Sequence, residues 1–506
     1  MNQTHVCSYM EYWALTDPDR TAVVDENGSL TYGALKSACE RVATGLAGRI
    51  GHGQPVAVLM EKGIPALCSF WGSVYAGGFY VMFNPDLPDA RLAQIQSVLA
   101  APCVITDAAH EERALALFAR EQVLRIEELL EATADPLLLA RIRSRMIDTD
   151  PLYANFTSGS TGIPKGVLVS HRSVLDFIGQ FSEIFGFTGE DIFANQAPFD
   201  FDVSVKDIYT SACVGGTLVI TPKRLFSRPT ELLDWLCDHR VTVMIWAVSA
   251  LCLISTFHGL DYRTPQTVRK ILFSGEVMPA KHLKTWRTHL PEAEYVNLYG
   301  PTEITCNCTY HVLDPARDYA EGIPIGKHFP NEHVFLLDAD NREITVPDVE
   351  GEICVRGTAL ALGYLSAPEQ TAAAFVQNPL NSCYPEIIYR TGDLARYNAD
   401  GDLLFCGRRD HQIKYMGHRI ELQEIDQAIA RVDGVERCCS IFDEERHKLY
   451  AFYVGTIDRR ELHQILRKDL PVFMVPGSLE AVPDFPLTKN GKIDRKALLA
   501  GKEKKR

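Results

Sequence analysis

Between Leu152 and Val169 the sequence reads LYANFTSGSTGIPKGVLV, in which two apolar segments flank a loop of small and polar residues. The apolar segments, Leu152–Asn155 and Val167–Val169, predict two β-strands. Ser, Thr and Gly residues let backbone N–H groups and hydroxyls close around phosphate oxygens, and Lys165 adds a cation. We therefore interpret 156–166 as a phosphate-binding loop. The alternative is a flexible connection between strands.

This loop differs from the P-loop of nucleoside triphosphatases. Lys165 is followed by Gly166, where a P-loop has Ser or Thr, and the glycine spacing does not match. The loop thus predicts phosphate binding with another architecture.

Further apolar runs, each short enough for a buried strand, alternate with helical patterns. They are Val56–Met60, Pro102–Thr106, Thr217–Ile220 and Val243–Trp246. Strands that alternate with helices predict layered α/β sheets. Between Val334 and Arg409 the pattern changes to short alternating segments broken by Gly, Asp and Asn, which predicts a small antiparallel β unit. After Asp410 we expect a helix near 422–432, a strand near 449–454 and a helix near 460–470.

Size and composition limit the possible classes of protein. A chain of 506 residues with 46% hydrophobic and 23% charged residues predicts two or more folded domains. Its formal net charge of -14 argues against nucleic-acid binding, which needs a cationic surface.

The cysteines and apolar runs bear on the compartment. The 14 cysteines form no CxxC pair and no cluster with metal-ligand spacing, so we expect reduced thiols in a cytoplasmic protein. No signal peptide is recognisable, and no apolar run reaches the roughly 18 to 20 residues that span a bilayer.

Several polar motifs follow the loop in a fixed order. They are Tyr299-Gly300-Pro301-Thr302-Glu303, Tyr389-Arg390-Thr391-Gly392-Asp393, Gly407-Arg408-Arg409-Asp410, Lys414 to Glu421, and Pro486-Leu487-Thr488-Lys489-Asn490-Gly491-Lys492. Taken singly each has an ordinary explanation: Asp393 could cap a turn, Tyr299 could pack in the core, and Lys492 could be a solvated surface residue.

Together, and in this order, the motifs resemble the adenylate-forming superfamily, which includes amino-acid adenylation domains, acyl-CoA synthetases and luciferases. The resemblance extends from Leu30 to Lys492. It implies a large N-terminal domain of layered α/β sheets with a small β-barrel-like subdomain, residues 1–409, followed by a small, mobile α+β C-terminal domain, residues 410–506. It also implies ATP and Mg²⁺ as cofactors and a hinge at Asp410.

The resemblance also implies roles for single residues. Lys492 would act on the reacting carboxylate, Thr302 on phosphate, and Glu303 on Mg²⁺, which would make these three the catalytic residues. The nucleotide would contact Thr157, Ser158, Gly159, Ser160, Thr161, Gly162, Lys165, Asn297, Tyr299, Asp393 and Arg408. These roles agree with the chemistry, because attack of a carboxylate on the α-phosphate builds negative charge that a cation, a metal and N–H donors stabilise.

The segment Phe199-Asp200-Phe201-Asp202-Val203-Ser204 bears on the substrate. In amino-acid adenylating relatives the aspartate at the position of Asp202 pairs with the substrate ammonium. At ~4 Å such a pair is worth about 4 kcal/mol before desolvation. The alternative is that Asp202 caps a helix. The closest resemblance is to D-alanine:carrier protein ligases, which implies a carrier protein with a phosphopantetheine thiol as partner.

By motif order, the substrate side chain would be surrounded by Asp202, Val203, Lys206, Ser249, Leu272, Ser274, Leu298, Cys306 and Asn307. Lys206 and Ser274 depart from the D-alanine enzymes, which have an apolar residue and a cysteine there. An inward Lys206 would favour a polar or acidic substrate, whereas a lysine more commonly reaches the surface. We expect D-alanine or another small or polar amino acid. An acyl-CoA synthetase for a small acid and a non-catalytic nucleotide-binding protein are the alternatives.

Overall fold

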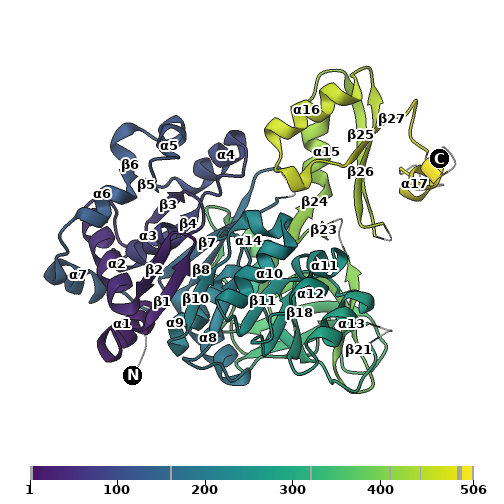
Figure 1. The fold of residues 1–506 in the computed structure, drawn as a ribbon. Coiled ribbons are helices and arrows are strands. Elements are labelled where there is room, and N and C mark those ends of the chain that lie inside the picture. Colours follow the sequence, from purple (N-terminus) through teal and green to yellow (C-terminus); the bar gives the residue numbers. More distant parts are fainter. Residues whose placement is uncertain are drawn as a thin grey trace. The chain divides into compact units, whose positions relative to one another are not determined.

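The computed structural model describes residues 4–159, 162–319, 322–409, 412–444, 446–486 and 493–503 (Figure 1). The chain divides into two compact units. The large unit comprises Met1–Asn84, Leu99–Asn155 and Gly166–Arg409, and the small unit comprises Pro85–Val98, Phe156–Lys165 and Asp410–Arg506. The division that we predicted, 1–409 and 410–506, stays a proposal, because the small unit also includes two segments from the N-terminal part.

A mixed sheet of the large unit has the strand order β15-β14-β13-β12-β11-β9-β10-β1-β2. Its strands are β1 (Thr21–Asp25), β2 (Gly28–Thr31), β9 (Ile192–Asn195), β10 (Thr217–Ile220), β11 (Val243–Ala247), β12 (Lys270–Ser274), β13 (Glu294–Tyr299), β14 (Thr309–Val312) and β15 (Lys327–His328). Neighbouring strands are parallel in the stretch β13-β12-β11-β9-β10-β1 of this order. The outer strands β2, β14 and β15 pair antiparallel with their neighbours. The parallel strands are rich in apolar residues because both faces of such a sheet are covered.

A second sheet has the order β19-β8-β7-β4-β3-β5-β6. Its strands are β3 (Pro55–Leu59), β4 (Phe79–Met82), β5 (Val104–Thr106), β6 (Val123–Arg125), β7 (Pro151–Thr157), β8 (Lys165–Ser170) and β19 (Gly363–Tyr364). The strands predicted on either side of the predicted phosphate-binding loop are thus confirmed as β7 and β8, and the other predicted parallel strands are confirmed as β3, β5, β10 and β11.

The predicted antiparallel β unit is also confirmed. Its strands are β16 (Glu332–Leu337), β17 (Glu343–Ile344), β18 (Gly351–Gly357), β20 (Phe375–Gln377), β21 (Ile387–Tyr397) and β22 (Leu403–Arg408), and neighbouring strands among them pair antiparallel.

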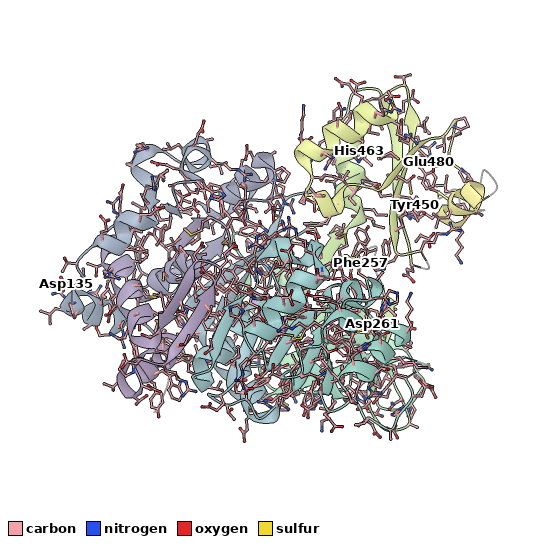
Figure 2. All side chains as sticks on the ribbon, in the orientation of Figure 1. Asp135, Phe257, Asp261, Tyr450, His463 and Glu480 are labelled. Carbon is pink, nitrogen blue, oxygen red and sulfur yellow. The ribbon has the colours of Figure 1, made fainter. Side chains whose placement is uncertain are left out.

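Helices cover the two large sheets (Figure 1). They are α1 (Cys7–Thr16), α2 (Tyr32–Leu46), α3 (Ile64–Tyr75), α5 (Glu111–Leu117), α6 (Ile126–Glu131), α7 (Pro136–Arg143), α8 (His171–Ile184), α9 (Val203–Val214), α10 (Pro229–Asp238), α11 (Val248–Thr256), α12 (Gly259–Tyr262), α13 (Ala280–His289) and α14 (Pro368–Ala374), with the short 3-10 turns η1 (Arg120–Gln122), η2 (Lys223–Ser227) and η3 (Thr302–Ile304). Some begin at polar caps: the Asp135 carboxylate accepts from the backbone N–H groups of Leu137 and Leu138 in α7 (Figure 2).

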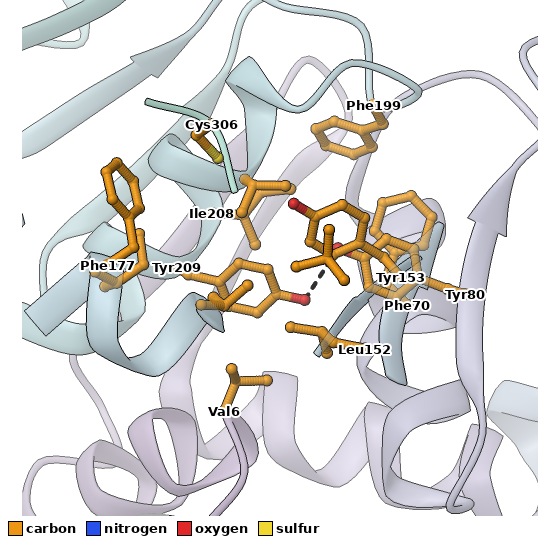
Figure 3. Packing of buried hydrophobic residues seen from close by; sticks show 14 of the residues in the cluster. Val6, Phe70, Tyr80, Leu152, Tyr153, Phe177, Phe199, Ile208, Tyr209 and Cys306 are labelled. Carbon is orange, nitrogen blue, oxygen red and sulfur yellow. Dashed lines mark hydrogen bonds between the residues drawn. The ribbon is translucent and has the colours of Figure 1, made fainter. Parts of the chain in front are cut away.

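One hydrophobic core joins both large sheets. Phe70 of α3, Tyr80 of β4 and Tyr209 of α9 lie close together in it, and the Tyr209 hydroxyl donates to that of Tyr80 at 3.0 Å (Figure 3). Burying such large side chains removes apolar area from water at about 25 cal/mol per Å². This core therefore fixes α9, which carries the candidate site residues Val203 and Lys206.

The small unit has its own core and sheets. Its elements are α4 (Asp89–Leu99), β23 (Gln412–Tyr415), β24 (His418–Glu421), α15 (Leu422–Ala430), β25 (Val435–Asp443), β26 (Lys448–Gly455), α16 (Arg459–Asp469), η4 (Val472–Met474), β27 (Ser478–Ala481) and α17 (Arg495–Glu503). The elements predicted after Asp410 are confirmed as α15, β26 and α16. Tyr450 of β26 is buried in a hydrophobic cluster of this unit (Figure 2).

Within the described part of the chain, no helix combines the length and apolar character needed to cross a membrane. The fold class is α/β, with a large N-terminal and a small C-terminal part.

Candidate functional site

The predicted substrate residues gather where parallel strands end. Because β11, β12 and β13 are parallel, their carboxyl ends lie at one edge of the sheet, the edge at which open α/β sheets bind ligands. Leu272 and Ser274 come from β12 and Leu298 from β13; Ser249 lies in the first turn of α11, directly after β11. Alternation along the strands puts Leu272, Ser274 and Leu298 on one face of the sheet. The three strand residues thus share one face of the sheet, and Ser249 follows β11 at the same edge.

Lys206 points into the protein. Its side chain is 0% exposed, and its Nζ donates to Asn307 Oδ1 at 2.6 Å and to Ser274 Oγ at 3.5 Å. Burial lowers the pKa of Lys206, because desolvation disfavours the charged form. The alternative that Lys206 reaches the surface is therefore wrong.

Asp202 lies at the beginning of α9, with Val203 as the first residue of that helix. Its side chain makes no capping hydrogen bond to the helix, so the helix-cap alternative is wrong. The Cys306 thiol donates to the backbone carbonyl of Asp202 at 3.2 Å. We call Asp202, Lys206, Ser274, Cys306 and Asn307 the Lys206 cluster, because hydrogen bonds link Lys206 to two of them and Cys306 to Asp202.

The backbone beside this cluster is strained. Thr305 and Cys306 have φ angles of 37° and 77°, a left-handed region that costs non-glycine residues of order 1–3 kcal/mol each. The Thr305 hydroxyl, which donates to Ala359 O at 2.7 Å, holds the segment in place. No pattern in the sequence indicated this strain.

A second group contains the predicted nucleotide residues Tyr299, Asp393 and Arg408. Asp393 is 1% exposed; the Tyr299 hydroxyl donates to its Oδ2 at 2.5 Å, and Arg408 Nη1 donates to its Oδ1. Burial, followed by the charge of Asp393, raises the pKa of Tyr299 well above its usual range, so the phenol stays a donor. Asp393 lies within β21 and caps no turn. Tyr299 also belongs to the hydrophobic core, as one alternative proposed.

Glu303 and Thr302 lie in η3, which directly follows β13. Glu303 is buried, and its Oε1 accepts from the Tyr364 hydroxyl at 2.8 Å. Sequence reasoning missed Tyr364, because it is 61 residues away and belongs to no quoted motif. Asn297 donates through its amide to Pro324 O at 2.9 Å.

Glu303 is compatible with a magnesium ion. Mg²⁺ in nucleotide enzymes is commonly held by one or two carboxylates together with substrate phosphates and water. The described residues contain no cluster of three or more His, Cys, Asp or Glu side chains that could hold a metal. A single protein carboxylate that binds Mg²⁺ together with the phosphates of ATP needs no such cluster, and it matches the usual way in which nucleotide enzymes hold this ion.

Residues 156–165 of the predicted phosphate-binding loop belong to the small unit. The Ser158 hydroxyl donates to Arg419 O at 2.8 Å and accepts from Glu421 N at 3.2 Å. A Cβ at Gly159 would lie 2.0 Å from Ile163 O, and Gly162 has a φ of 77°, so both positions require glycine. Thr157 ends β7 and Lys165 begins β8. Ser160, Thr161, Asp410 and Lys492 lie outside the described residues.

A polar network that sequence reasoning did not identify links α9 to β9, with Asp207 and Asn195 fully buried and Lys62 partly buried. Asn195 donates to Asp207 Oδ2 at 3.0 Å, while Lys62 Nζ donates to Asn195 Oδ1 at 3.1 Å and to Gln196 O at 2.9 Å. Burial raises the pKa of Asp207 to about 8 and lowers that of Lys62 to about 7.

Comparison with known proteins shows the family to which the chain is related. Residues 10–365 match the family model described as AMP-binding enzyme, and residues 424–492 match that of the AMP-binding enzyme C-terminal domain. Among structures, holo-PA1221, described as a nonribosomal peptide synthetase (NRPS) protein containing adenylation and PCP domains, has a TM-score of 0.84 at 26% identity over 98% of this chain and 84% of that chain.

Two relatives are similar at the level of sequence. Tyrocidine synthase 3 of Brevibacillus parabrevis is 33% identical over 497 residues, which are 97% of this chain and 7% of that protein. The chain thus corresponds to a small part of that relative's length. Zwittermicin A synthase ZmaJ of Bacillus cereus is 31% identical over 524 residues, 99% of this chain and 96% of that protein. The chain belongs to the AMP-binding enzyme family and is an adenylate-forming enzyme.

Proposed function

We propose that this chain adenylates an amino acid with ATP and transfers the aminoacyl group to the phosphopantetheine thiol of a carrier protein. The observation that carries the proposal is Asp202, a carboxylate that directly precedes α9 without capping it and whose backbone carbonyl accepts from the thiol of Cys306. A carboxylate at this place offers a counter-ion for a substrate ammonium, for which a plain carboxylic acid has no use.

In the first half-reaction, a substrate carboxylate oxygen forms a bond to the α-phosphorus of ATP, and the bond to the β-phosphate oxygen breaks, releasing pyrophosphate. Lys492 stabilises the negative charge that develops on the reacting oxygens. Asp393 and Arg408 orient the ribose, Tyr299 packs against adenine, and Thr302 and the loop 156–166 bind phosphate. Mg²⁺, held by Glu303 when bound, supplies charge neutralisation of the phosphates.

In the second half-reaction, the carrier thiol gives its proton to solvent, and the resulting thiolate attacks the acyl carbon. The carbon–sulfur bond forms, the bond between the acyl carbon and the phosphate oxygen breaks, and AMP leaves. A carrier partner is supported by the relative PA1221, whose description includes a PCP domain beside the adenylation domain. D-Alanine or another small or polar amino acid is the proposed substrate, and the cytoplasm is the proposed compartment.

Amino-acid-dependent exchange of pyrophosphate into ATP, measured across L- and D-amino acids, tests the proposal. Asp202→Asn should raise the KM for the amino acid by at least about tenfold and leave the KM for ATP nearly unchanged, because only the charge opposite the ammonium is lost. Asp200→Asn is the matched control: its carboxylate lies in the same segment but accepts from the Asn84 amide at 3.0 Å. Turnover of a small acid with free CoA and without any amino acid would instead indicate an acyl-CoA synthetase.

A further inference from the structure

Lys206 is a fully buried lysine whose direct hydrogen-bond partners are neutral. Its Nζ contacts an amide oxygen of Asn307 and a hydroxyl of Ser274, and in the described part of the chain it forms no ion pair. The Ser274 contact, at 3.5 Å, is at the limit for a hydrogen bond. An ammonium has three donors, so one of them has no acceptor among the described residues and another is weakly used.

A buried charge without a counter-ion is costly, because neutral partners replace only part of its hydration. Two acidic groups near Lys206 do not supply the missing charge. Burial raises the pKa of Asp207 to about 8, and its Oδ2 accepts from Asn195. Burial also raises the pKa of Cys306 well above its usual range, so this thiol is neutral near pH 7.

Asp202 is the remaining carboxylate of the Lys206 cluster. It lies one helical turn before Lys206, so both residues lie on the same face of α9. Asp202 and Val203 are partly exposed, whereas Lys206 is fully buried. The cluster therefore has an accessible acidic end and a closed basic end, with the apolar Leu272 and Leu298 among the neighbouring predicted substrate residues.

We infer that the amino acid activated by this chain carries a second carboxylate in its side chain, which pairs with Lys206 while Asp202 pairs with the α-ammonium. This inference rests on the proposed function and names its substrate class, an amino dicarboxylic acid. The side-chain carboxylate replaces the weak contact of Lys206 with Ser274. Asn307, which accepts from Lys206 through Oδ1, keeps its amide N–H group available as a donor to the same carboxylate.

The decisive experiment compares substrates of nearly identical shape on the unmodified enzyme. Pyrophosphate exchange is measured with L- and D-aspartate and glutamate, with asparagine and glutamine, and with glycine and alanine. A dicarboxylic amino acid should exceed its own amide in kcat/KM by at least about tenfold, because the amide leaves the buried ammonium without a counter-ion. This comparison needs no variant and does not depend on whether one folds.

Lys206→Met provides the second measurement. It should lower kcat/KM for the dicarboxylic acid by at least about tenfold and shift preference toward the amide or alanine. Lys62→Met is the matched control, because this partly buried lysine donates to Asn195 and Gln196 and lies outside the cluster. It should leave the ranking of amino acids unchanged.

The outcomes separate the two proposals. If alanine, glycine or an amide is activated best by the parent enzyme, and Lys206→Met keeps that ranking, the inference is overturned while amino-acid adenylation stands. If no amino acid supports exchange, the proposed function fails, and this inference fails with it.

Discussion

At the scale of single residues, the network of Asp207, Asn195 and Lys62 contains two titratable groups whose pKa values are shifted toward each other. The pKa of Asp207 rises to about 8 and that of Lys62 falls to about 7, in both cases chiefly because burial disfavours the charged form. Asn195 lies between them and bonds to both. Near neutral pH the network can thus hold little net charge in the interior.

This network predicts a pH dependence of stability. The folded-state pKa of Asp207 lies above the ordinary value of about 3.9, so its contribution to the free energy of unfolding is fully present below pH ~4 and is lost as pH rises through about 8. Asp207→Asn keeps the shape of the neutral acid and should flatten the decline in stability between pH 5 and 8. Urea unfolding midpoints at several pH values measure this.

The contribution of Lys62 to stability changes with pH in the opposite direction. Because its folded pKa of about 7 lies below the ordinary value of about 10.4, its contribution to stability rises above pH ~7. Between pH 5 and 7, therefore, Asp207 is the one of these two groups whose contribution to stability changes. The control Asp340→Asn, at an exposed residue, should keep the parent's slope. An Asp207→Asn protein with the same slope would show that Asp207 is ionised throughout this range.

At the scale of elements, the segment between β13 and β14 organises both groups of candidate residues. Tyr299 ends β13, η3 carries Thr302 and Glu303, and Cys306 and Asn307 follow within the same turn. The turn closes on itself at Gly300: a Cβ there would lie 2.4 Å from Asn307 Cα and 2.8 Å from Cys308 N. Because the obstructing atoms are backbone, they cannot move aside cheaply.

Gly300→Ala should therefore displace the turn. We expect a loss of about 1–3 kcal/mol in the free energy of unfolding from overpacking, together with a drop in pyrophosphate exchange, since both Tyr299 and Asn307 adjoin the clash. Gly179→Ala is the matched control: Gly179 lies in α8 with no atom within 4 Å of the added Cβ. It should raise stability by about 0.5–1 kcal/mol, as alanine is the better helix former. Similar effects of the two substitutions would contradict a steric role for Gly300.

At the scale of the whole molecule, the chain has two compact units. The proposed function requires it to catalyse two half-reactions, adenylation and thiol transfer. The family resemblance implies that the C-terminal domain changes position between adenylation and thiol transfer, with a hinge at Asp410. This residue lies outside the described part of the chain, so the hinge remains a proposal.

Asp410→Pro should restrict that hinge, because proline fixes φ near −65°. We expect one half-reaction to lose far more rate than the other, measured as pyrophosphate exchange and as aminoacyl transfer to a phosphopantetheine thiol. Ala339→Pro is the control, in the exposed turn between β16 and β17, where Asn341 N donates to Asp338 O. Equal losses in both half-reactions would argue against a hinge at Asp410.

Local patterns in the sequence determined the elements and the order of the motifs. Apolar runs predicted β3, β10 and β11, because a buried parallel strand needs apolar side chains on both faces. The composition of the loop 156–166 predicted phosphate binding, because Gly, Ser and Thr are the residues whose backbone and hydroxyl groups can surround an anion. These signals extend over a few residues and are therefore visible without a structure.

Only the tertiary structure decided which distant side chains meet. Lys206 bonds to a residue 101 positions later, Tyr299 to one 94 positions later, and Glu303 accepts from one 61 positions later. The sequence left Lys206 free to reach the surface, and burial of α9 between packed elements excluded this. The physical reason is that the periodicity of side chains records the local backbone, whereas partners across a sheet depend on how the whole core packs.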